Sequence, residues 1–383
     1  MKTQLDVIPL AKPVMGAREE ELVLDVLRSG QLSLGPRVPA FEAAFAERVG
    51  ARHACAVSSG TTGLDLALRA VGVEPGDEVV TTPFSFVASA NCILYERAKP
   101  VFADVEPRTF NLDPAAAERA ITPATKAIMP VHQLGLPADM DAFLTIAERH
   151  GLALVEDAAC AIGATYKGRP VGSLGPPACF SLHPRKVITT GEGGMIAVRD
   201  QAVADRLRRL RQHAMDVSDL ARHAASDVVI ESYPERGWNY RMTDMQAALG
   251  LCQLDALDDI LADRRRIAGR YTAAIEPIDF LEAPYEPGYA QRTWQSYAVT
   301  LAPDAPVDRN ELMRLLLADG VPTRRGVMAS HEEGAYADVE ADLPHTEAAS
   351  RSSLMLPLFA GMTDEQQDHV IGCLARHLSA VAA

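Results

Sequence analysis

The sequence predicts an α/β protein that consists of a large, doubly wound, mostly parallel sheet domain and a smaller C-terminal α/β domain. Short apolar, β-prone runs alternate with helical stretches from residue 38 to about residue 200, and a long helix candidate follows them. Such alternation is typical of βαβ units, which build parallel sheets. Ligands of these sheets bind at the carboxyl ends of the strands, so we expect the functional residues there.

The strand candidates of the large domain are short apolar runs. Most segments between them have helical spacing; over residues 138–151, for example, apolar positions recur every three or four residues. The strand candidates, in chain order, are residues 53–57, 77–82, 99–105, 125–131, 152–157, 178–182 and 194–200.

The long helix is expected to start at Thr243, because Thr243 and Gln246 form a capping-box pattern, and to run towards Tyr271. The next segment, residues 275–289, is rich in proline and acidic residues, and we place the domain boundary there. We therefore predict a large domain and a small domain, over residues 1–274 and 275–383. The small domain should contain one strand and two helices, over residues 296–302, 308–320 and about 363–378.

Composition and charge argue against several classes of function. The chain has 383 residues and a net charge of −14, whereas nucleic acid and anionic membranes bind dense basic patches, so we expect neither as a partner. No apolar run approaches the roughly 18 residues of a membrane span. The first 13 residues lack the uninterrupted apolar core of a signal peptide, so we expect a cytoplasmic protein.

The six cysteines show neither CxxC nor Cys/His ligand spacing. This pattern predicts free thiols in a reducing compartment and no metal site. The cysteines are Cys55, Cys92, Cys160, Cys179, Cys252 and Cys373.

Lysine is rare in this chain, which has 37 basic residues but only six lysines. One of them, Lys186, lies just beyond the strand candidate 178–182 and precedes a run of small, flexible residues. Most lysines are solvated surface charges. The position of Lys186 at a strand end indicates instead that its amine has a chemical role.

Three further features lie at strand ends, and each has an ordinary structural alternative. The turn at residues 60–62 opens a helix, so its amides can hold a phosphate, or it is simply an N-capped turn. Asp157 can pair with a protonated ring nitrogen, or it caps the next turn. Phe84 or Phe86 can stack on a planar ligand, or both join the core. Together with an amine, these features match the requirements of pyridoxal phosphate.

The chain resembles the pyridoxal-phosphate-dependent sugar aminotransferases of the DegT/StrS group, which have the type I aminotransferase fold. The motifs that carry this likeness follow one another along nearly the whole chain and include "SSGTTGLDLAL", "PVFADVEPRTFNLDP", "LVEDAACAIGATYKG", "SLHPRKVITTGEGG" and "GWNYRMTDMQAALGLCQLDAL". The resemblance implies a transaminase with pyridoxal 5'-phosphate as its cofactor.

The resemblance also implies roles for individual residues. Lys186 matches the Schiff-base lysine, Asp157 the acid that pairs with the pyridine nitrogen, and Phe86 the aromatic residue that stacks on the ring. Asn239 matches an asparagine that reaches the cofactor phosphate of the neighbouring subunit, which implies an obligate homodimer with shared active sites. The phosphate cup is matched by Gly60, Thr61, Thr62 and Ser181. The substrate pocket is matched more loosely by His183, Glu192 and His331.

Two residues depart from the pattern of the family. Cys160 stands where the family commonly has a glutamine that contacts the phenolic oxygen of the cofactor, and Ile162 stands where a histidine is common. The first change affects the hydrogen bond to that oxygen. The second favours a drier or differently shaped pocket.

We therefore predict ping-pong transfer of an amino group from L-glutamate or L-glutamine to a keto sugar, which in this family is usually linked to a nucleotide. Such an acceptor carries a diphosphate, for which Arg324 and Arg325 are candidate ligands; the alternative is an ordinary solvated pair. Two other functions stay open: an aminocyclitol transaminase that acts on a keto-inositol, and a regulatory relative without turnover.

Overall fold

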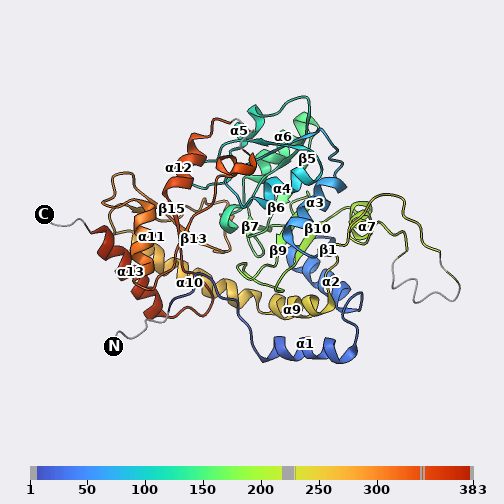
Figure 1. Cartoon of the computed structure of the whole chain (residues 1–383), viewed down its shortest axis with the longest axis horizontal. Coiled ribbons are helices and arrows are strands. Elements are labelled where there is room, and N and C mark those ends of the chain that lie inside the picture. The colour runs from blue at the N-terminus through green and yellow to red at the C-terminus, as the bar shows by residue number, and fades with distance from the viewer. Residues whose placement is uncertain (1–6, 218–227, 229, 337–338, 340, 380–383) are drawn as a thin grey trace.

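The computed structural model describes residues 7–217, 228, 230–336, 339 and 341–379 (Figure 1). Eight short strands form the centre of the larger part of the molecule. They are β1 (His53–Val57), β2 (Glu78–Thr81), β3 (Lys99–Phe102), β4 (Thr125–Met129), β5 (Ala153–Leu154), β6 (Glu156–Asp157), β9 (Ala178–Ser181) and β10 (Gly194–Val198).

These strands form two sheets that continue into each other. The orders are β3-β2-β4-β5 and β1-β10-β9-β6, and all neighbours are parallel except β10, which runs antiparallel to β1 and β9. The sheets join because Asp157 N donates to the carbonyl of Pro130 and His132 N donates to the carbonyl of Asp157, both at 2.9 Å. The predicted mostly parallel sheet is confirmed.

Helices cover both faces of this sheet. Along β1, Ala54 and Ala56 face the core beneath α2, whereas Cys55 and Val57 face the core beneath α3 and α7, because successive side chains of a strand alternate. The helices around the sheet are α2 (Arg37–Val49), α3 (Gly60–Ala70), α4 (Ala88–Tyr95), α5 (Pro114–Arg119), α6 (Met140–His150) and α7 (Gln201–Leu210).

The single long helix expected from Thr243 towards Tyr271 is two helices, α9 (Asp244–Asp255) and α10 (Leu257–Ile275). Thr243 is the N-cap and shares the predicted capping box with Gln246. The helix is interrupted at Ala256, whose ψ of −3° departs from helical geometry. α9 packs on α2 and on α1 (Ala17–Ser29), and α10 continues into the C-terminal part (Figure 1).

The C-terminal part contains an antiparallel sheet in the order β11-β13-β15-β14. Its core includes Tyr271 and Ile275 of α10, and the Tyr271 hydroxyl donates to the carbonyl of Pro357 at 3.0 Å. The division at residues 274 and 275 stays a prediction. The elements are β11 (Leu281–Glu282), β13 (Tyr297–Leu301), α11 (Arg309–Ala318), β14 (Arg324–Arg325), α12 (Pro344–Ser352), β15 (Ser353–Leu356) and α13 (Asp364–Leu378).

A third, three-stranded sheet combines two strands that lie between β6 and β9 in the chain with one strand that lies between β11 and β13. It has the order β12-β7-β8, with β7 (Thr165–Tyr166), β8 (Arg169–Pro170) and β12 (Ala290–Gln291). Short 3-10 helices complete the described elements: η1 (Gln133–Gly135), η2 (Ser330–Glu332) and η3 (Gly334–Tyr336). Within the described ranges, no helix has the length and apolarity to cross a membrane.

Candidate active site

A cavity of about 560 Å³, here called the active cavity, lies at the carboxyl ends of the parallel strands. Ser59 and Gly60 follow β1, Val131 and His132 follow β4, and Asp157 ends β6. The C-terminal part closes the other side of the cavity with residues from β14, β15 and their flanking loops. The cavity is therefore where the predicted sheet topology expects a ligand.

Lys186 is the only lysine among the described residues that line the active cavity. Its backbone N–H donates to the carbonyl of His183 at 2.8 Å, in the turn that follows β9. Its Nζ donates to the Sγ of Cys160 at 3.0 Å. The amine and the thiol of the unusual Cys160 are thus in direct contact inside the cavity.

Asp157 is buried, with 3% of its surface exposed, and lines the same cavity. One carboxylate oxygen accepts a hydrogen bond from Ser89 Oγ at 2.6 Å, and the other accepts the backbone N–H of Ala159 at 3.1 Å. Ser89 Oγ lies 2.7 Å from Ser85 Oγ. These donors stabilise the charged carboxylate and hold it in one orientation.

The phosphate cup predicted at the start of α3 lines the cavity through Ser59, Gly60, Thr61 and Ser181. A Cβ on Gly60 would lie 2.9 Å from the Cβ of Ser181, so the close approach of these two segments requires glycine. Thr62 is not a lining residue, because its hydroxyl donates to the carbonyl of Ser59 at 2.9 Å and completes the helix cap.

The two phenylalanines after β2 have different environments. Phe84 is fully buried and contacts Phe110 edge to face, with ring centroids 5.4 Å apart. Phe86 is 60% exposed and lines the active cavity. Only Phe86 can therefore offer a ring face to a ligand, as the family resemblance implied.

Three arginines line the active cavity, Arg185 in the loop after β9 and Arg324 and Arg325 in β14, and we call this part of the lining the mouth of the cavity. Burial and then the positive charges of Arg185 and Arg325 lower the pKa of Arg324. Arg325 pairs with Glu333 at 2.8 Å, whereas neither Arg185 nor Arg324 has a carboxylate partner among the described residues. The mouth therefore carries uncompensated positive charge.

His183 and Glu192 line the cavity, with 4.0 Å between His183 Nε2 and the Glu192 carboxylate. Partial burial lowers the pKa of His183, so its ring is neutral near neutral pH. His331 does not join them. It is half-buried 3.8 Å from Glu347, and the residue before it, Ser330, donates its backbone N–H to the carbonyl of Pro83 in the loop after β2.

Asn239 is exposed and does not line the cavity of its own chain. Its segment is held against α7 by backbone hydrogen bonds from Trp238 N to Leu210 O and from Tyr240 N to Arg211 O. A role for Asn239 in the site of a neighbouring subunit stays a prediction.

The structure adds residues that sequence reasoning missed. His132 and Glu156 are fully buried and lie 2.9 Å apart, and His132 Nδ1 accepts the N–H of Ala138, so the proton on Nε2 points to Glu156. Ser89 contacts Asp157 across 68 positions of sequence. Ser85 and Ser89 are four residues apart in the sequence, and Ser85 directly precedes Phe86. This spacing could have indicated a pair of serines near the site.

The chain is similar to known proteins along nearly its whole length. The model of the "DegT/DnrJ/EryC1/StrS aminotransferase family" matches residues 13–375. The chain is 41% identical to GDP-perosamine synthase from Caulobacter vibrioides, over 96% of this chain and 97% of that protein. It is 40% identical to the spore coat polysaccharide biosynthesis protein SpsC from Bacillus subtilis, over 95% of each.

The fold is similar to that of DesV from S. venezuelae, whose crystal structure superposes with a TM-score of 0.90. The two chains are 32% identical, and the match covers 98% of this chain and 100% of that one.

Proposed function

The chain belongs to the DegT/DnrJ/EryC1/StrS aminotransferase family, and from this premise we propose that it transfers an amino group from L-glutamate or L-glutamine to a nucleotide-linked keto sugar. The predicted type I fold and the predicted class of enzyme, a sugar aminotransferase that uses pyridoxal phosphate, are confirmed. The donor, the nucleotide and the ping-pong order are proposals.

The lining of the active cavity fits pyridoxal phosphate. The glycine-dependent approach of Gly60 to Ser181 leaves backbone N–H groups free at the start of α3 for a phosphate. Asp157 offers a charged acceptor for a ring N–H, Phe86 a flat apolar face, and Lys186 a primary amine. When bound, this cofactor supplies an electron sink for proton removal next to an amino group.

The residues of the chain then have separate tasks. We assign Lys186 the role of general base and acid, which would remove a proton from the reacting carbon of the substrate and return it, because its Nζ is the one lysine amine in the cavity among the described residues. Asp157, held by Ser89 and the N–H of Ala159, keeps a proton on the ring nitrogen. We propose that donor and acceptor use this one cavity in turn, as a ping-pong order requires.

The choice of acceptor rests on the arginines at the mouth of the active cavity. In a chain of net charge −14, a diphosphate is repelled unless positive charge is concentrated where it binds. Arg185 and Arg324 have no carboxylate partner among the described residues, and the planar guanidinium group suits phosphate oxygens. A diphosphate-linked sugar is therefore the acceptor that this mouth favours.

We also propose a cytoplasmic homodimer in which Asn239 completes the site of the partner. Phe86, Leu94 and Tyr95, on or just before α4, are large apolar side chains that remain exposed, as expected for a contact surface.

The experiment measures the two half-reactions separately. Replacement of both Arg324 and Arg325 by alanine should weaken acceptor binding, with a loss that shrinks at high salt, and should leave the glutamate half-reaction nearly unchanged. The control is Arg314→Ala, an exposed arginine that pairs with Glu311 on α11. An acceptor half-reaction that survives the double replacement, or turnover with an uncharged keto-cyclitol, would contradict the nucleotide-linked acceptor.

A further inference from the structure

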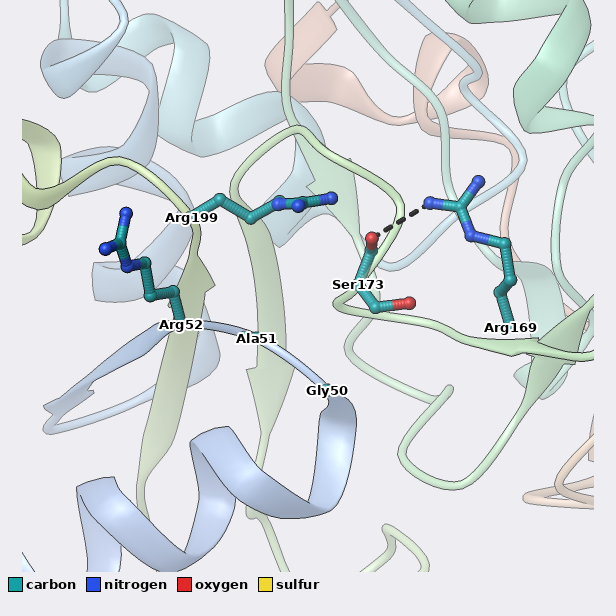
Figure 2. Close-up of a pocket in the computed structure, with 6 residues that line it drawn as sticks. All are labelled: Gly50, Ala51, Arg52, Arg169, Ser173 and Arg199. Atoms are coloured by element: carbon teal, nitrogen blue, oxygen red, sulfur yellow. Dashed lines mark hydrogen bonds between the residues drawn. The ribbon is translucent and has the colours of Figure 1, made fainter.

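A second hollow, of about 530 Å³, lies at the opposite end of the sheet from the active cavity, and we call it the outer hollow (Figure 2). His53 begins β1 and pairs with Val198, which ends β10, so the residues next to them, Arg52 and Arg199, lie at one edge of the sheet. The active cavity begins beyond the other end of β1. The outer hollow and the active cavity are therefore separated by the length of β1, which is about 16 Å for its five residues at 3.3 Å per residue. The outer hollow is lined by Gly50, Ala51, Arg52, Arg169, Ser173 and Arg199.

Three arginines from three separate segments line this hollow, and we call them the arginine trio: Arg52, Arg169 and Arg199. Arg52 follows the C-cap of α2, Arg199 follows β10, and Arg169 belongs to β8. In Figure 2 the side chains of Arg169 and Arg199 point towards Ser173 from opposite sides, and Arg169 donates to the carbonyl of Ser173 at 3.0 Å.

The backbone geometry brings these segments together. Gly50 has a φ of 65°, in the left-handed region that favours glycine, and turns the chain sharply after α2. A Cβ at this position would lie 3.3 Å from the Cβ of Ser173, so the turn and the loop after β8 are in close contact. The trio therefore sits on ordered turns that converge on one hollow.

The trio forms no ion pair with a described carboxylate, although the pKa of Asp141, which is lowered chiefly by its pair with Lys167, is lowered also by Arg169. Among the described residues that line the hollow, none is acidic. By contrast, Arg48 on α2 pairs with Asp258. Asp200, next to Arg199, is engaged as the N-cap of α7, where it accepts the N–H of Val203 at 2.9 Å.

The end of α2 compensates only part of this charge. A helix C-terminus carries the equivalent of about half a negative charge. Three guanidinium groups exceed that by several-fold, in a chain whose total charge is −14. The outer hollow is thus a local positive site that favours an anion.

We propose that the outer hollow binds a small molecule with a diphosphate group, at a site separate from the active cavity. One phosphate monoester carries about −1.5 to −2 charges, so a diphosphate matches three guanidinium groups better than a single phosphate does. Guanidinium forks bind phosphate oxygens with paired, charge-assisted hydrogen bonds. The volume of about 530 Å³ lies within the range of small-molecule sites, roughly 300–1,000 Å³.

The test is a calorimetric titration of the cofactor-saturated enzyme with inorganic pyrophosphate and, separately, with a nucleoside diphosphate at low salt. All proteins carry Arg324→Ala and Arg325→Ala, so that the mouth of the active cavity contributes little. We expect binding that weakens by roughly tenfold or more when the whole trio is replaced by alanine. The matched control replaces three exposed, ion-paired arginines, Arg18, Arg314 and Arg351, and changes the net charge equally.

Equal affinity in the trio variant and the matched control would overturn the proposal, and so would the absence of binding by both anions. Binding of an acidic peptide without any binding of pyrophosphate or nucleoside diphosphate would overturn it as well. If the trio variant melts earlier than the control, Arg199→Lys provides the second test. It keeps the charge but removes the fork, and its affinity should fall between those of the intact trio and the alanine variant.

Discussion

At the scale of single residues, the active cavity combines one amine with one carboxylate held in place by hydrogen bonds. Lys186 contacts Cys160 at 3.0 Å, and Asp157 is held by Ser89 at 2.6 Å. The first contact joins residues that lie 26 positions apart, and the second joins residues 68 positions apart. Both are therefore products of the sheet topology, which brings strand ends together, and both can be tested by substitution.

We predict that borohydride reduction of the cofactor-loaded enzyme attaches the pyridoxyl group to Lys186, because no other described lysine lines the cavity. Peptide mapping by mass spectrometry checks this. Lys167→Ala is the control, since Lys167 is exposed and pairs with Asp141 at 2.6 Å. A label on Lys167 or Lys126 in the unmodified enzyme would contradict the assignment of Lys186.

We predict that Ser89→Ala lowers the transamination rate through Asp157. A hydrogen bond to a charged group contributes about 1.5–3 kcal/mol, which corresponds to a rate loss of roughly 10- to 150-fold if the bond acts fully in the transition state. In an Asp157→Asn background, Ser89→Ala should have little further effect, because interacting residues are not additive. Single-turnover kinetics of all four proteins measure this coupling.

The control for this cycle is Ser85→Ala, which removes the hydroxyl next to Ser89 but not the contact with Asp157. It should cost less than Ser89→Ala. Additive losses from Ser89→Ala and Asp157→Asn would show that Ser89 supports only the local structure.

At the scale of elements, α3 contributes both to the active cavity and to the contact with the segment that carries Asn239. Its first turn lines the active cavity, where the phosphate cup is predicted, and its buried Asp65 accepts a hydrogen bond from the hydroxyl of Tyr240 at 3.1 Å. Arg69, one turn later, lies over the ring of Trp238, 4.8 Å from its centroid. α3 thereby anchors the segment that carries Asn239, so cofactor site and predicted subunit contact share one helix.

We predict that Asp65→Asn changes how stability depends on pH. Burial and then the neighbouring Glu96 raise the pKa of Asp65 to about 7. An unfolded aspartate has a pKa of about 3.9, so the folded chain binds one more proton between roughly pH 4 and 7, and stability falls as the pH rises through this window. Asp65→Asn removes this pH-dependent contribution to stability and keeps a side-chain oxygen that can accept the hydrogen bond from Tyr240.

The unfolding free energy of the variant, relative to the parent, should therefore increase from pH 4 to pH 7. Urea titrations across this range measure the difference. Asp304→Asn, which changes an exposed carboxylate that has no hydrogen bond or ion pair to any described residue, should give a flat difference. A flat difference for Asp65→Asn would contradict the raised pKa.

At the scale of the whole molecule, positive charge is concentrated at two places in an acidic chain. The mouth of the active cavity has Arg185 and Arg324 without carboxylate partners among the described residues, and the outer hollow has the arginine trio. The overall charge of −14 opposes anion binding elsewhere on the surface. Two anion sites at opposite ends of one sheet can then bind their ligands independently.

The predicted dimer has a consequence for the whole assembly. If Asn239 serves the site of the partner, Lys186→Ala and Asn239→Ala proteins, each inactive alone, should regain roughly a quarter of the parent activity after subunit exchange, because half of the dimers are mixed and one of their two sites is intact. A mixture of Lys186→Ala with Asp157→Asn is the control and should stay inactive. Failure of the first mixture after confirmed exchange would place Asn239 in its own subunit's site.

Much of the fold follows from the sequence because local signals determine it. The strand candidate at residues 53–57 coincides with β1, and Thr243 caps α9 as its capping box predicts. Lys186, Asp157 and Gly60 reach one cavity because each lies at a strand end, and the carboxyl ends of parallel strands meet at one edge of a sheet. For these features, the pattern within a short stretch of chain already contains the physical cause.

Other features depend on contacts that no local pattern contains. Phe84 and Phe86 are the same residue type two positions apart, and packing against Phe110 decides which one is buried. The break at Ala256 lets α10 place Tyr271 in the C-terminal core, and the arginine trio needs three segments to converge. Tertiary structure alone decides these points, because they depend on which distant residues fill the neighbouring space.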